Sequence, residues 1–322
     1  MSILNKPHFH NEQAAYDFVE SHVWAGGRSC PHCGTVEDSG KLQGKSTRIG
    51  VYKCYSCRKP FTVKVGTIFQ GSHIKLHIWL QAIFLISSSK KGISSNQLAR
   101  VLDVTVKSAW FMSHRIREAM GGGKMPPMGG EGKIVEADET YFGKKKERAT
   151  MTTAGKPFIK RGSGGVHKRA IVSLVERGGS VRSFHVDRAD KETVARIVTN
   201  NISKQSKLFS DESRLYLGAD AHVSEHQTVR HYGGEYARGE VHTNTIEGYF
   251  SIFKRGMKGV YQHCDEKHLH RYLSEFDFRY NNRVGLGVDD QQRAVNLVKG
   301  IVGKRLLYKT ASGPKHEKTA KA

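Results

Sequence analysis

Two short cysteine pairs place the strongest constraint on how the first part of this chain can fold. Cys30 and Cys33 lie in the sequence CPHC, and Cys54 and Cys57 lie in CYSC, with twenty residues between the pairs. Each Cys-x2-Cys turn presents two thiolates, and two such turns at this distance bind one Zn²⁺ in a closed tetrahedral site. The pairs therefore predict a structural zinc ribbon rather than free thiols or redox-active pairs.

Two other residues with metal-binding chemistry fall outside this prediction. His32 lies inside the first cysteine turn, but four thiolates already complete the tetrahedron. Cys264 stands alone in the sequence, and we expect it to be an inert thiol in a hydrophobic core.

The charge balance indicates a polyanionic partner. The chain has 52 Lys and Arg residues against 30 Asp and Glu residues, which gives a formal net charge of +22. Such an excess favours nucleic acid, with an anionic membrane surface as the second possibility. No polybasic anchor is evident, and the apolar run IWLQAIFLI at 78–86 is too short to span a bilayer. Because the first residues do not resemble a signal peptide, we expect a soluble, cytoplasmic protein.

Composition along the chain predicts several modules. The Gly- and Pro-rich segment GGGKMPPMGGEGK marks the clearest boundary, and the expected elements change from helices to strands after it. We expect an N-terminal helix and zinc ribbon (1–70), a helix-turn-helix DNA-binding region (71–122), a linker (123–132), a catalytic domain (133–300) and a basic, disordered tail (301–322).

The segment GISSNQLARVLDVTVKSAWFMSHRIREAM has the layout of a helix-turn-helix. Ser95 is a suitable cap for the first helix, the dipeptide DV forms the turn, and the second helix begins near Thr105. That helix would enter a DNA major groove and offer Lys107, Ser108 and Arg115. A plain helical hairpin used for packing fits the same spacing, but the neighbouring cysteine pairs and the positive charge favour DNA binding.

The second half of the chain predicts a mixed sheet flanked by helices. The expected order is strands at 133–143, 170–179 and 181–190, a helix at 191–202, a strand at 206–211 and a helix at 244–259. Alternation along the first strand places five side chains on one face: Ile134, Glu136, Asp138, Thr140 and Phe142.

Three carboxylates in this half are candidate metal ligands. Asp138 lies within a strand, where Asp is disfavoured, Asp211 ends another strand, and Glu247 lies early in a helix. Two strand aspartates and a helix glutamate in this order fit a two-metal phosphoryl-transfer site for Mg²⁺ or Mn²⁺. Each has a structural alternative, because Glu247 fits a capping box with Asn244, Asp211 can cap a helix and Asp138 can pair with an arginine.

Basic residues accompany these carboxylates. Lys254 follows Glu247 by seven residues, so both lie on one helix face, where a cation can hold a DNA phosphate beside the metals. Arg255 and Lys258 follow, although late-helix cations also suit the helix dipole. The basic insert at 144–169 is expected to be a mobile loop that contacts DNA, beginning with Lys144, Lys145 and Lys146; a merely disordered segment is the alternative. Tyr141 and Tyr249 are less suited to be nucleophiles than to pack or contact DNA.

At this point the chain resembles the DDE-superfamily transposases of bacterial insertion sequences, in the subgroup with an N-terminal zinc ribbon and an ISXO2-like transposase domain. The segments that carry the resemblance are CPHC…CYSC, GTIF (66–69), SSKKGISSNQLAR (88–100), AWFMSHRIREAM (109–120), VEADETYFGKKK (135–146), HTNTIEGYFSIFKRGMKGVYQH (242–263) and KHLHRYLSEFDFRYNNR (267–283). The resemblance implies a ribonuclease-H-like α/β catalytic domain. It also implies that Asp138, Asp211 and Glu247 are the metal-binding triad, with Lys254 as the associated basic residue and Asn244 as an auxiliary or alternative to Glu247.

The resemblance further implies an activity on DNA. The N-terminal modules would bind the terminal inverted repeats, and two Mg²⁺ ions would support cleavage at the element's ends and strand transfer into target DNA. Because such enzymes act on paired ends, a homodimer or a higher synaptic assembly in the bacterial nucleoid is expected. The alternatives are a nuclease of the same fold without strand transfer, and a zinc-ribbon regulator with a structural C-terminal domain.

Overall fold

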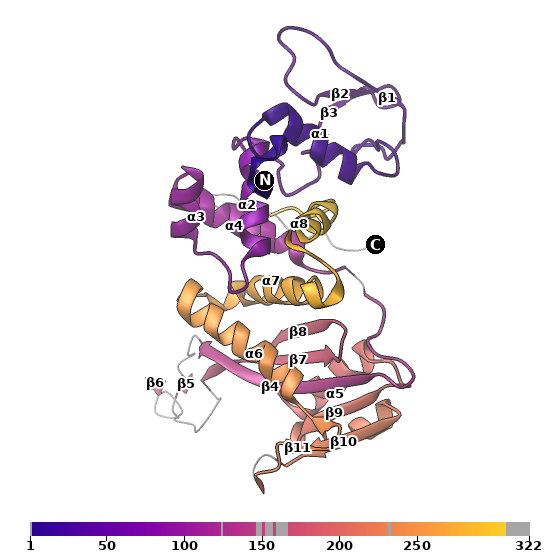
Figure 1. Ribbon diagram of the computed structural model, residues 1–322, viewed down its shortest axis with the longest axis vertical. Coiled ribbons are helices and arrows are strands. Elements are labelled where there is room, and N and C mark those ends of the chain that lie inside the picture. The colour runs from indigo at the N-terminus through magenta and orange to yellow at the C-terminus, as the bar shows by residue number, and fades with distance from the viewer. Residues whose placement is uncertain are drawn as a thin grey trace.

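The computed structural model describes residues 2–123, 125–145, 150–151, 157–158, 167–230 and 233–306. Figure 1 shows a small sheet at one end, helices in the middle and a larger sheet at the other end. The helices are α1 (Glu12–Val23), α2 (Leu76–Ser88), α3 (Ser95–Leu102), α4 (Val106–Met120), α5 (Lys191–Asn201), α6 (Asn244–Gly256), α7 (Leu269–Asn281) and α8 (Asp290–Lys299). The strands are β1 (Ser39–Lys41), β2 (Tyr52–Cys54), β3 (Pro60–Phe61), β4 (Ile134–Lys144), β5 (Thr150–Met151), β6 (Pro157–Phe158), β7 (Lys168–Glu176), β8 (Val181–Val186), β9 (Lys207–Asp211), β10 (Glu225–Val229), β11 (Ala237–Arg238) and β12 (Val241–His242). Within these described ranges, no helix is both long and apolar enough to cross a membrane.

The cysteine pairs lie in the small sheet. Strands β1, β2 and β3 form an antiparallel sheet in that order, and Tyr52 and Phe61 pack with Trp24 beside the buried cysteines. This apolar cluster is small, and a module of this size normally needs a metal or a disulfide to remain folded.

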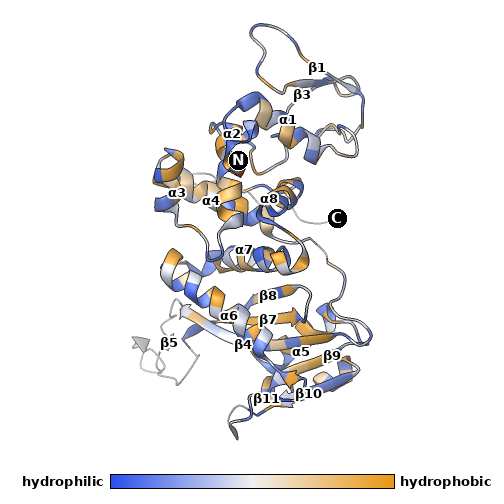
Figure 2. Cartoon of the chain, viewed as in Figure 1, coloured by the Kyte–Doolittle hydropathy of each residue, from blue (hydrophilic) through white to orange (hydrophobic). Residues whose placement is uncertain are grey.

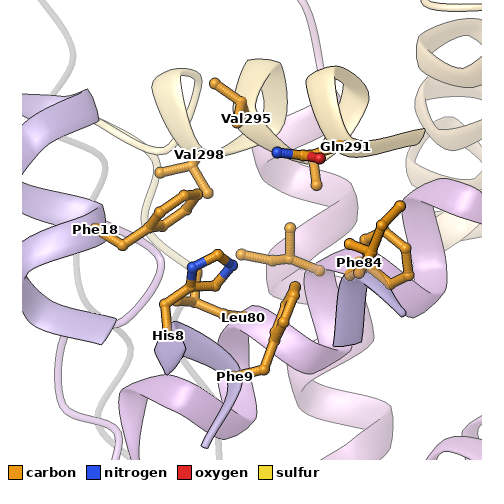
Figure 3. A pocket seen from close by; sticks show the side chains of 11 residues that line it. His8, Phe9, Phe18, Leu80, Phe84, Gln291, Val295 and Val298 are labelled. Atoms are coloured by element: carbon orange, nitrogen blue, oxygen red, sulfur yellow. The ribbon is translucent and has the colours of Figure 1, made fainter. Parts of the chain in front are cut away.

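The middle layer is a helical core that contains both ends of the described chain. Helix α8 packs against α1 and α2, so residues distant in sequence share one core. Figure 3 shows His8, Phe9 and Phe18 beside Leu80 of α2, with Val298 of α8 close by. The expected domain division assigned α8 to the catalytic region, whereas its packing partners lie in the N-terminal half. Ile301 is buried in the same core, so the first residue of the tail that was expected to be disordered is packed. Residues 307–322 lie outside the described part of the chain.

Helices α3 and α4 have the expected helix-turn-helix layout. The hydroxyl of Ser94, one residue before the expected cap, accepts the N–H of Gln97, and Thr105 caps α4 by accepting the N–H of Ser108. Asp103 has a φ of 50°, the left-handed conformation that ends α3 and turns the chain.

The larger sheet has five strands in the order β10-β9-β4-β7-β8. Strand β7 is antiparallel to both β4 and β8, whereas β9 is parallel to both β4 and β10. Three antiparallel strands followed by two parallel ones, with helices on both faces, form the ribonuclease-H-like topology, and the expected fold class is confirmed. Strand β10 was not among the expected elements.

Each face of this sheet has its own core. Helix α5 covers one face, where Val194 and Val198 pack against Val135 and Leu208. Helices α6 and α7 cover the other face with a cluster that includes Phe253. In Figure 2 the neighbouring strand β7, which is buried along most of its length, has mainly apolar colours. Helix α6 thereby lies over β4, the strand that carries Asp138.

A buried ionic network joins the helical core to the sheet. Arg117 of α4 donates from Nε to Glu275 of α7 at 2.6 Å, and Arg279 also donates to Glu275. Glu275 is completely buried and accepts a further bond from Tyr261, at the end of the π-helical turn that follows α6. The network therefore connects α4, α7 and the π-helical turn Met257–Tyr261 that follows α6.

Candidate active site and zinc site

The four expected zinc ligands lie together. The sulfur atoms of Cys30, Cys33, Cys54 and Cys57 all lie within 4.8 Å of one another. The Sγ atoms of Cys30 and Cys57 are 3.7 Å apart, and those of Cys33 and Cys54 are 3.6 Å apart. Since Zn–S bonds are about 2.3 Å long, sulfur atoms on a tetrahedron around Zn²⁺ are about 3.8 Å apart. The donor set and its dimensions therefore fit a structural Zn²⁺.

An acidic cluster lies where β4 and β9 adjoin. One carboxylate oxygen from each of Asp138, Glu139 and Asp211 lies within 4.8 Å of the others. Three hard oxygen donors at this separation form a donor set that Mg²⁺ or Mn²⁺ can bind. The cluster brings together two of the three expected carboxylates and adds one that was not expected.

Strand register explains why these side chains meet. Parallel pairing of β4 with β9 runs from Ile134 and Lys207 to Ala137 and Ser210. Asp138 and Asp211 are the next residues on their strands, so they lie side by side where the ladder ends. The Asp211 carboxylate also accepts the N–H of Ser213, which fixes it at the start of the following turn.

Glu139 was missed because strand alternation directs it to the opposite face from Asp138. The expected alternation is present: Phe142 packs on Phe253 of α6, and Glu139 instead accepts hydrogen bonds from Tyr216 at 3.2 Å and Ser213 at 3.4 Å. Past the end of the β4–β9 ladder, side chains from both faces of β4 reach Asp211. The adjacent acids in VEADETYFG were the available signal for Glu139.

Glu247 lies across a groove from this cluster. The groove is lined by Asp138, Glu139 and Thr140 from β4, and by Glu247 and Lys254 among the residues of α6. Helix α6 begins at Asn244, and the hydroxyl of Thr243 donates to the Glu247 carboxylate at 3.1 Å. The structure therefore does not contain the capping box of Asn244 and Glu247. Glu247 is exposed and is not part of the tight cluster.

The carboxylates repel one another electrostatically. Burial, with the charges of Asp211, Glu139 and Glu247, raises the pKa of Asp138 from 3.8 to about 8. Burial and the charge of Asp211 likewise raise the pKa of Glu139. A divalent cation would remove this repulsion, which is the second observation that fits a metal at the cluster.

Cations line the α6 side of the groove. Lys254, Arg255 and Lys258 follow Glu247 along α6 and the turn after it, and all three line the groove. The ammonium of Lys254 lies 5.9 Å from the ring centroid of Phe250, which supports its side chain on the groove wall. The expected placement of Lys254 on the face of Glu247 is therefore found.

The other expected DNA contacts are placed differently. Lys107 is exposed and Ser108 is half-buried at the start of α4, but Arg115 is 6% exposed. The Arg115 guanidinium donates to the carbonyl oxygens of Ile68 and Gln70, so the structure corrects its assignment as a base-contacting residue. Residues Met112 to Arg117 of α4 are all buried, so Arg115 lies too far along the helix to face solvent.

The first turns of α4 expose apolar side chains that were not expected. Val106 is 51% exposed and Trp110 is 36% exposed, and both flank Lys107. In the basic insert, Lys144 is exposed, whereas Lys145 donates to the carbonyl oxygen of Asp187. Lys146 lies outside the described residues.

The remaining expectations concern two tyrosines near the carboxylates, the lone cysteine and the histidine of the first cysteine turn. Tyr249 is buried and donates to Asp277 at 2.5 Å, which excludes it from the groove, while Tyr141 is partly exposed. Cys264 is half-buried, and burial raises the pKa of its thiol to about 11, as expected of an inert thiol. His32 lies outside the four-sulfur cluster, and its ring contacts the carbonyl oxygen of Pro60.

The fold and the site define a class: a zinc-ribbon protein whose ribonuclease-H-like domain carries clustered carboxylates in a basic groove. Residues 10–60 match the model of the transposase zinc-ribbon domain, and residues 129–281 match the model of the ISXO2-like transposase domain. The chain belongs to the insertion-sequence transposases that carry these two domains, as its motifs predicted.

The chain is also similar to one curated protein and to chains of solved structures. A protein from Halobacterium salinarum, described as an uncharacterized protein in transposable element ISH50, is 26% identical over 277 residues, covering 84% of this chain and 91% of that protein. Among solved structures, a simian T-cell lymphotropic virus intasome chain is 14% identical with a TM-score of 0.28, covering 56% of this chain and 63% of that chain. A chain of the pre-cleavage Mos1 transpososome is 12% identical with a TM-score of 0.24, covering 65% of this chain and 77% of that chain.

Proposed function

We propose that this transposase cleaves DNA at the ends of its element and joins the freed ends to target DNA, using divalent cations at Asp138, Asp211 and Glu247. The observation that carries the proposal is the carboxylate cluster of Asp138, Glu139 and Asp211 at one side of a groove whose other side is basic. A site of this composition attracts both a divalent cation and a phosphodiester, which are the two components of metal-assisted phosphoryl transfer.

In such a reaction the carboxylates would bind the metal ions and the basic side chains would bind the DNA phosphates. Bound Mg²⁺ or Mn²⁺ would supply Lewis acidity toward the scissile phosphate and would lower the pKa of water. Asp138 and Asp211 supply carboxylate oxygens from adjacent strands, and Glu247 supplies another from across the groove. Lys254 and Arg255 hold the phosphate backbone, so that the scissile bond lies over the carboxylates.

Glu139 and Asn244 are candidates for supporting roles. Glu139 is a fourth oxygen donor to the metals, and its bonds to Ser213 and Tyr216 hold it in place. Asn244 is exposed at the first position of α6, three residues before Glu247. We rank Glu247 ahead of Asn244 because a carboxylate binds Mg²⁺ more strongly than an amide does.

DNA binding outside the groove would use the N-terminal modules. Lys107 and Ser108 lie at the exposed start of α4, where a helix-turn-helix contacts the major groove. The zinc ribbon, Lys144 and the remaining basic residues of the insert would contact the phosphate backbone of the inverted repeats or the target. Because both ends of an element must be brought together before they are joined to target DNA, we propose that a homodimer or a larger synaptic assembly is the active form.

The test compares end cleavage and strand transfer by the wild-type chain and Asp138→Asn on labelled inverted-repeat DNA. Wild type should give Mg²⁺-dependent nicks and joined products, and Asp138→Asn should give neither while binding the same DNA. Glu131→Gln, which changes an exposed carboxylate just before β4, is the matched control and should retain activity. Nicks without joined products would identify a nuclease, and normal nicking by Asp138→Asn would refute the assigned site.

A further inference from the structure

An ion pair with a buried carboxylate lies between the strand of Asp138 and the helix of Glu247. Glu136 is completely buried, and the Nε atom of Arg177 donates to its carboxylate at 2.6 Å. Glu136 precedes Asp138 by two residues on β4, so both side chains face α6. A buried carboxylate is costly unless its oxygens are bonded, and this one accepts from Arg177, Thr245 and Ile246, with His242 Nδ1 3.4 Å away.

Glu136 provides the cap that the start of α6 otherwise lacks. Thr243 occupies the N-cap position, but its side chain makes no capping bond and donates to Glu247 instead. The carboxylate of Glu136 accepts the N–H of Ile246 at 2.9 Å and the hydroxyl of Thr245 at 2.8 Å. A negative charge at a helix N-terminus is favourable, so β4 holds α6 at the residue that immediately precedes Glu247.

Arg177 extends this arrangement to the other elements of the site. Its guanidinium donates to the carbonyl oxygens of Glu240 at 2.8 Å and His242 at 2.9 Å, in the chain that leads into α6. It also lies 5.1 Å from the ring centroid of Phe209, which is two residues before Asp211 on β9. The pair therefore contacts all three elements that carry the proposed metal-binding carboxylates: β4, β9 and α6.

We propose that Glu136 and Arg177 are a positioning pair that sets the distance between Glu247 and the two aspartates, and thereby sets the affinity of the site for divalent cations. This inference rests on the proposed function, because it assigns the pair to the same metal site. Mg²⁺ accepts only near-ideal coordination, with oxygen distances of about 2.0–2.1 Å. A shift of the first turn of α6 would therefore weaken metal binding without altering any ligand.

The test measures Mn²⁺ binding to the zinc-loaded, full-length chain by electron paramagnetic resonance, which detects the free ion and needs no catalysis. Glu136→Gln keeps the size of the side chain but turns an NH₂ group toward donors that need an acceptor. We expect Mn²⁺ to bind about tenfold more weakly, the range found when outer-shell partners of metal ligands are changed. The Mg²⁺ concentration for half-maximal cleavage should rise in parallel, while affinity for inverted-repeat DNA stays within about twofold, because the DNA-contacting surface is unchanged.

Arg177→Lys gives a second test, since it keeps the positive charge but loses the planar fork that bonds Glu240 and His242. Glu275→Gln is the matched control, because Glu275 is also fully buried between arginines, but its bonds come from α4, α7 and Tyr261 in the turn after α6, and none comes from β4, β9 or α6 itself. It should lower thermal stability and leave Mn²⁺ affinity unchanged.

The outcomes separate this inference from the function on which it rests. If Asp138→Asn binds Mn²⁺ as tightly as the wild-type chain does, the proposed function fails. If Asp138→Asn abolishes Mn²⁺ binding but folded Glu136→Gln and Arg177→Lys bind Mn²⁺ as wild type does, the proposed metal site stands and the positioning role is refuted. Weaker Mn²⁺ binding by both variants, with normal binding by Glu275→Gln, supports the positioning role.

Discussion

Asp138 and Asp211 occupy neighbouring positions on two adjacent parallel strands, and one oxygen of each lies within 4.8 Å of the other and of Glu139. Carboxylates this close cannot all remain ionised in a partly buried site without a cation. Divalent cations and protons therefore compete for the same oxygens, and the competition gives the site a measurable pH dependence.

We predict that the apparent affinity for Mg²⁺ rises with pH and levels off near pH 8. Burial, with the charges of Asp211, Glu139 and Glu247, raises the pKa of Asp138 to about 8, so below that pH a proton must leave before metal binds. Affinity should increase by up to about tenfold per pH unit below pH 8. Isothermal titration calorimetry in buffers of different ionisation enthalpy measures the released proton.

The metal-free protein should show the linked effect on stability. Because the pKa of Asp138 in the folded state lies above its ordinary value of 3.8, its contribution to stability is full below pH 3.8 and is lost as pH rises through 8. Asp138→Asn should remove this loss, so its melting temperature relative to wild type should increase between pH 5 and pH 9. Equal pH profiles for the two proteins would contradict the raised pKa.

Removal of zinc should unfold the ribbon and leave the larger sheet folded. The apolar cluster around Tyr52 and Phe61 is small, whereas the sheet has a core on both faces. Cys54→Ser deletes a buried ligand, so we expect loss of one equivalent of zinc by elemental analysis and much weaker binding to inverted-repeat DNA.

Cys264→Ser is the control for this experiment, because Cys264 lies outside the four-sulfur cluster. It should retain zinc and DNA affinity. Hydrogen exchange should show protection lost at residues 28–61 in Cys54→Ser and kept in β4 and β7. Full protection of the ribbon without zinc would show that the metal is not structural.

Sequence patterns predicted the parts of the site that depend on local structure. Asp138 and Asp211 could be assigned because a strand aspartate is unusual and because strands of a ribonuclease-H-like sheet end near one another. Glu139 could not, because alternation places it on the other face, and only the end of the β4–β9 ladder lets it reach Asp211. Glu136 was placed on the correct face, but its partner Arg177 lies 41 positions away in the chain, and no local pattern predicts that contact.

Long-range packing explains the other differences. Helix α8 joins the core of α1 and α2, although it follows the catalytic domain in sequence. Arg115 is a basic residue on the helix expected to contact DNA, yet its side of that helix is covered by the segment that contains Ile68. Hydrophobic periodicity identifies which face of a helix is buried, but it does not identify a polar residue whose bonds are made inside the protein.

Lys107→Ala should weaken DNA binding without changing stability, because Lys107 is exposed in the first turn of α4. If it contacts a phosphate, the slope of log affinity against log salt should decrease by about 1. Arg115→Ala should lower the melting temperature, because the carbonyl oxygens of Ile68 and Gln70 lose their donor, and should leave DNA affinity unchanged. Fluorescence anisotropy at several salt concentrations, with thermal melts, separates the two effects. Loss of affinity by folded Arg115→Ala with an unchanged melting temperature would restore its assignment to DNA.

Glu275→Ala should destabilise the junction between the helical core and the sheet. Glu275 is completely buried and accepts from Arg117 of α4 and Arg279 of α7, so its removal leaves two buried guanidinium groups without their carboxylate. Loss of one partner from a buried ion pair costs about 3–5 kcal/mol of unfolding free energy. Glu235→Ala breaks the exposed contact with Arg238 and should cost less than about 1 kcal/mol. Urea unfolding of both variants measures the difference, and equal costs would mean that the buried network contributes no more than a surface pair.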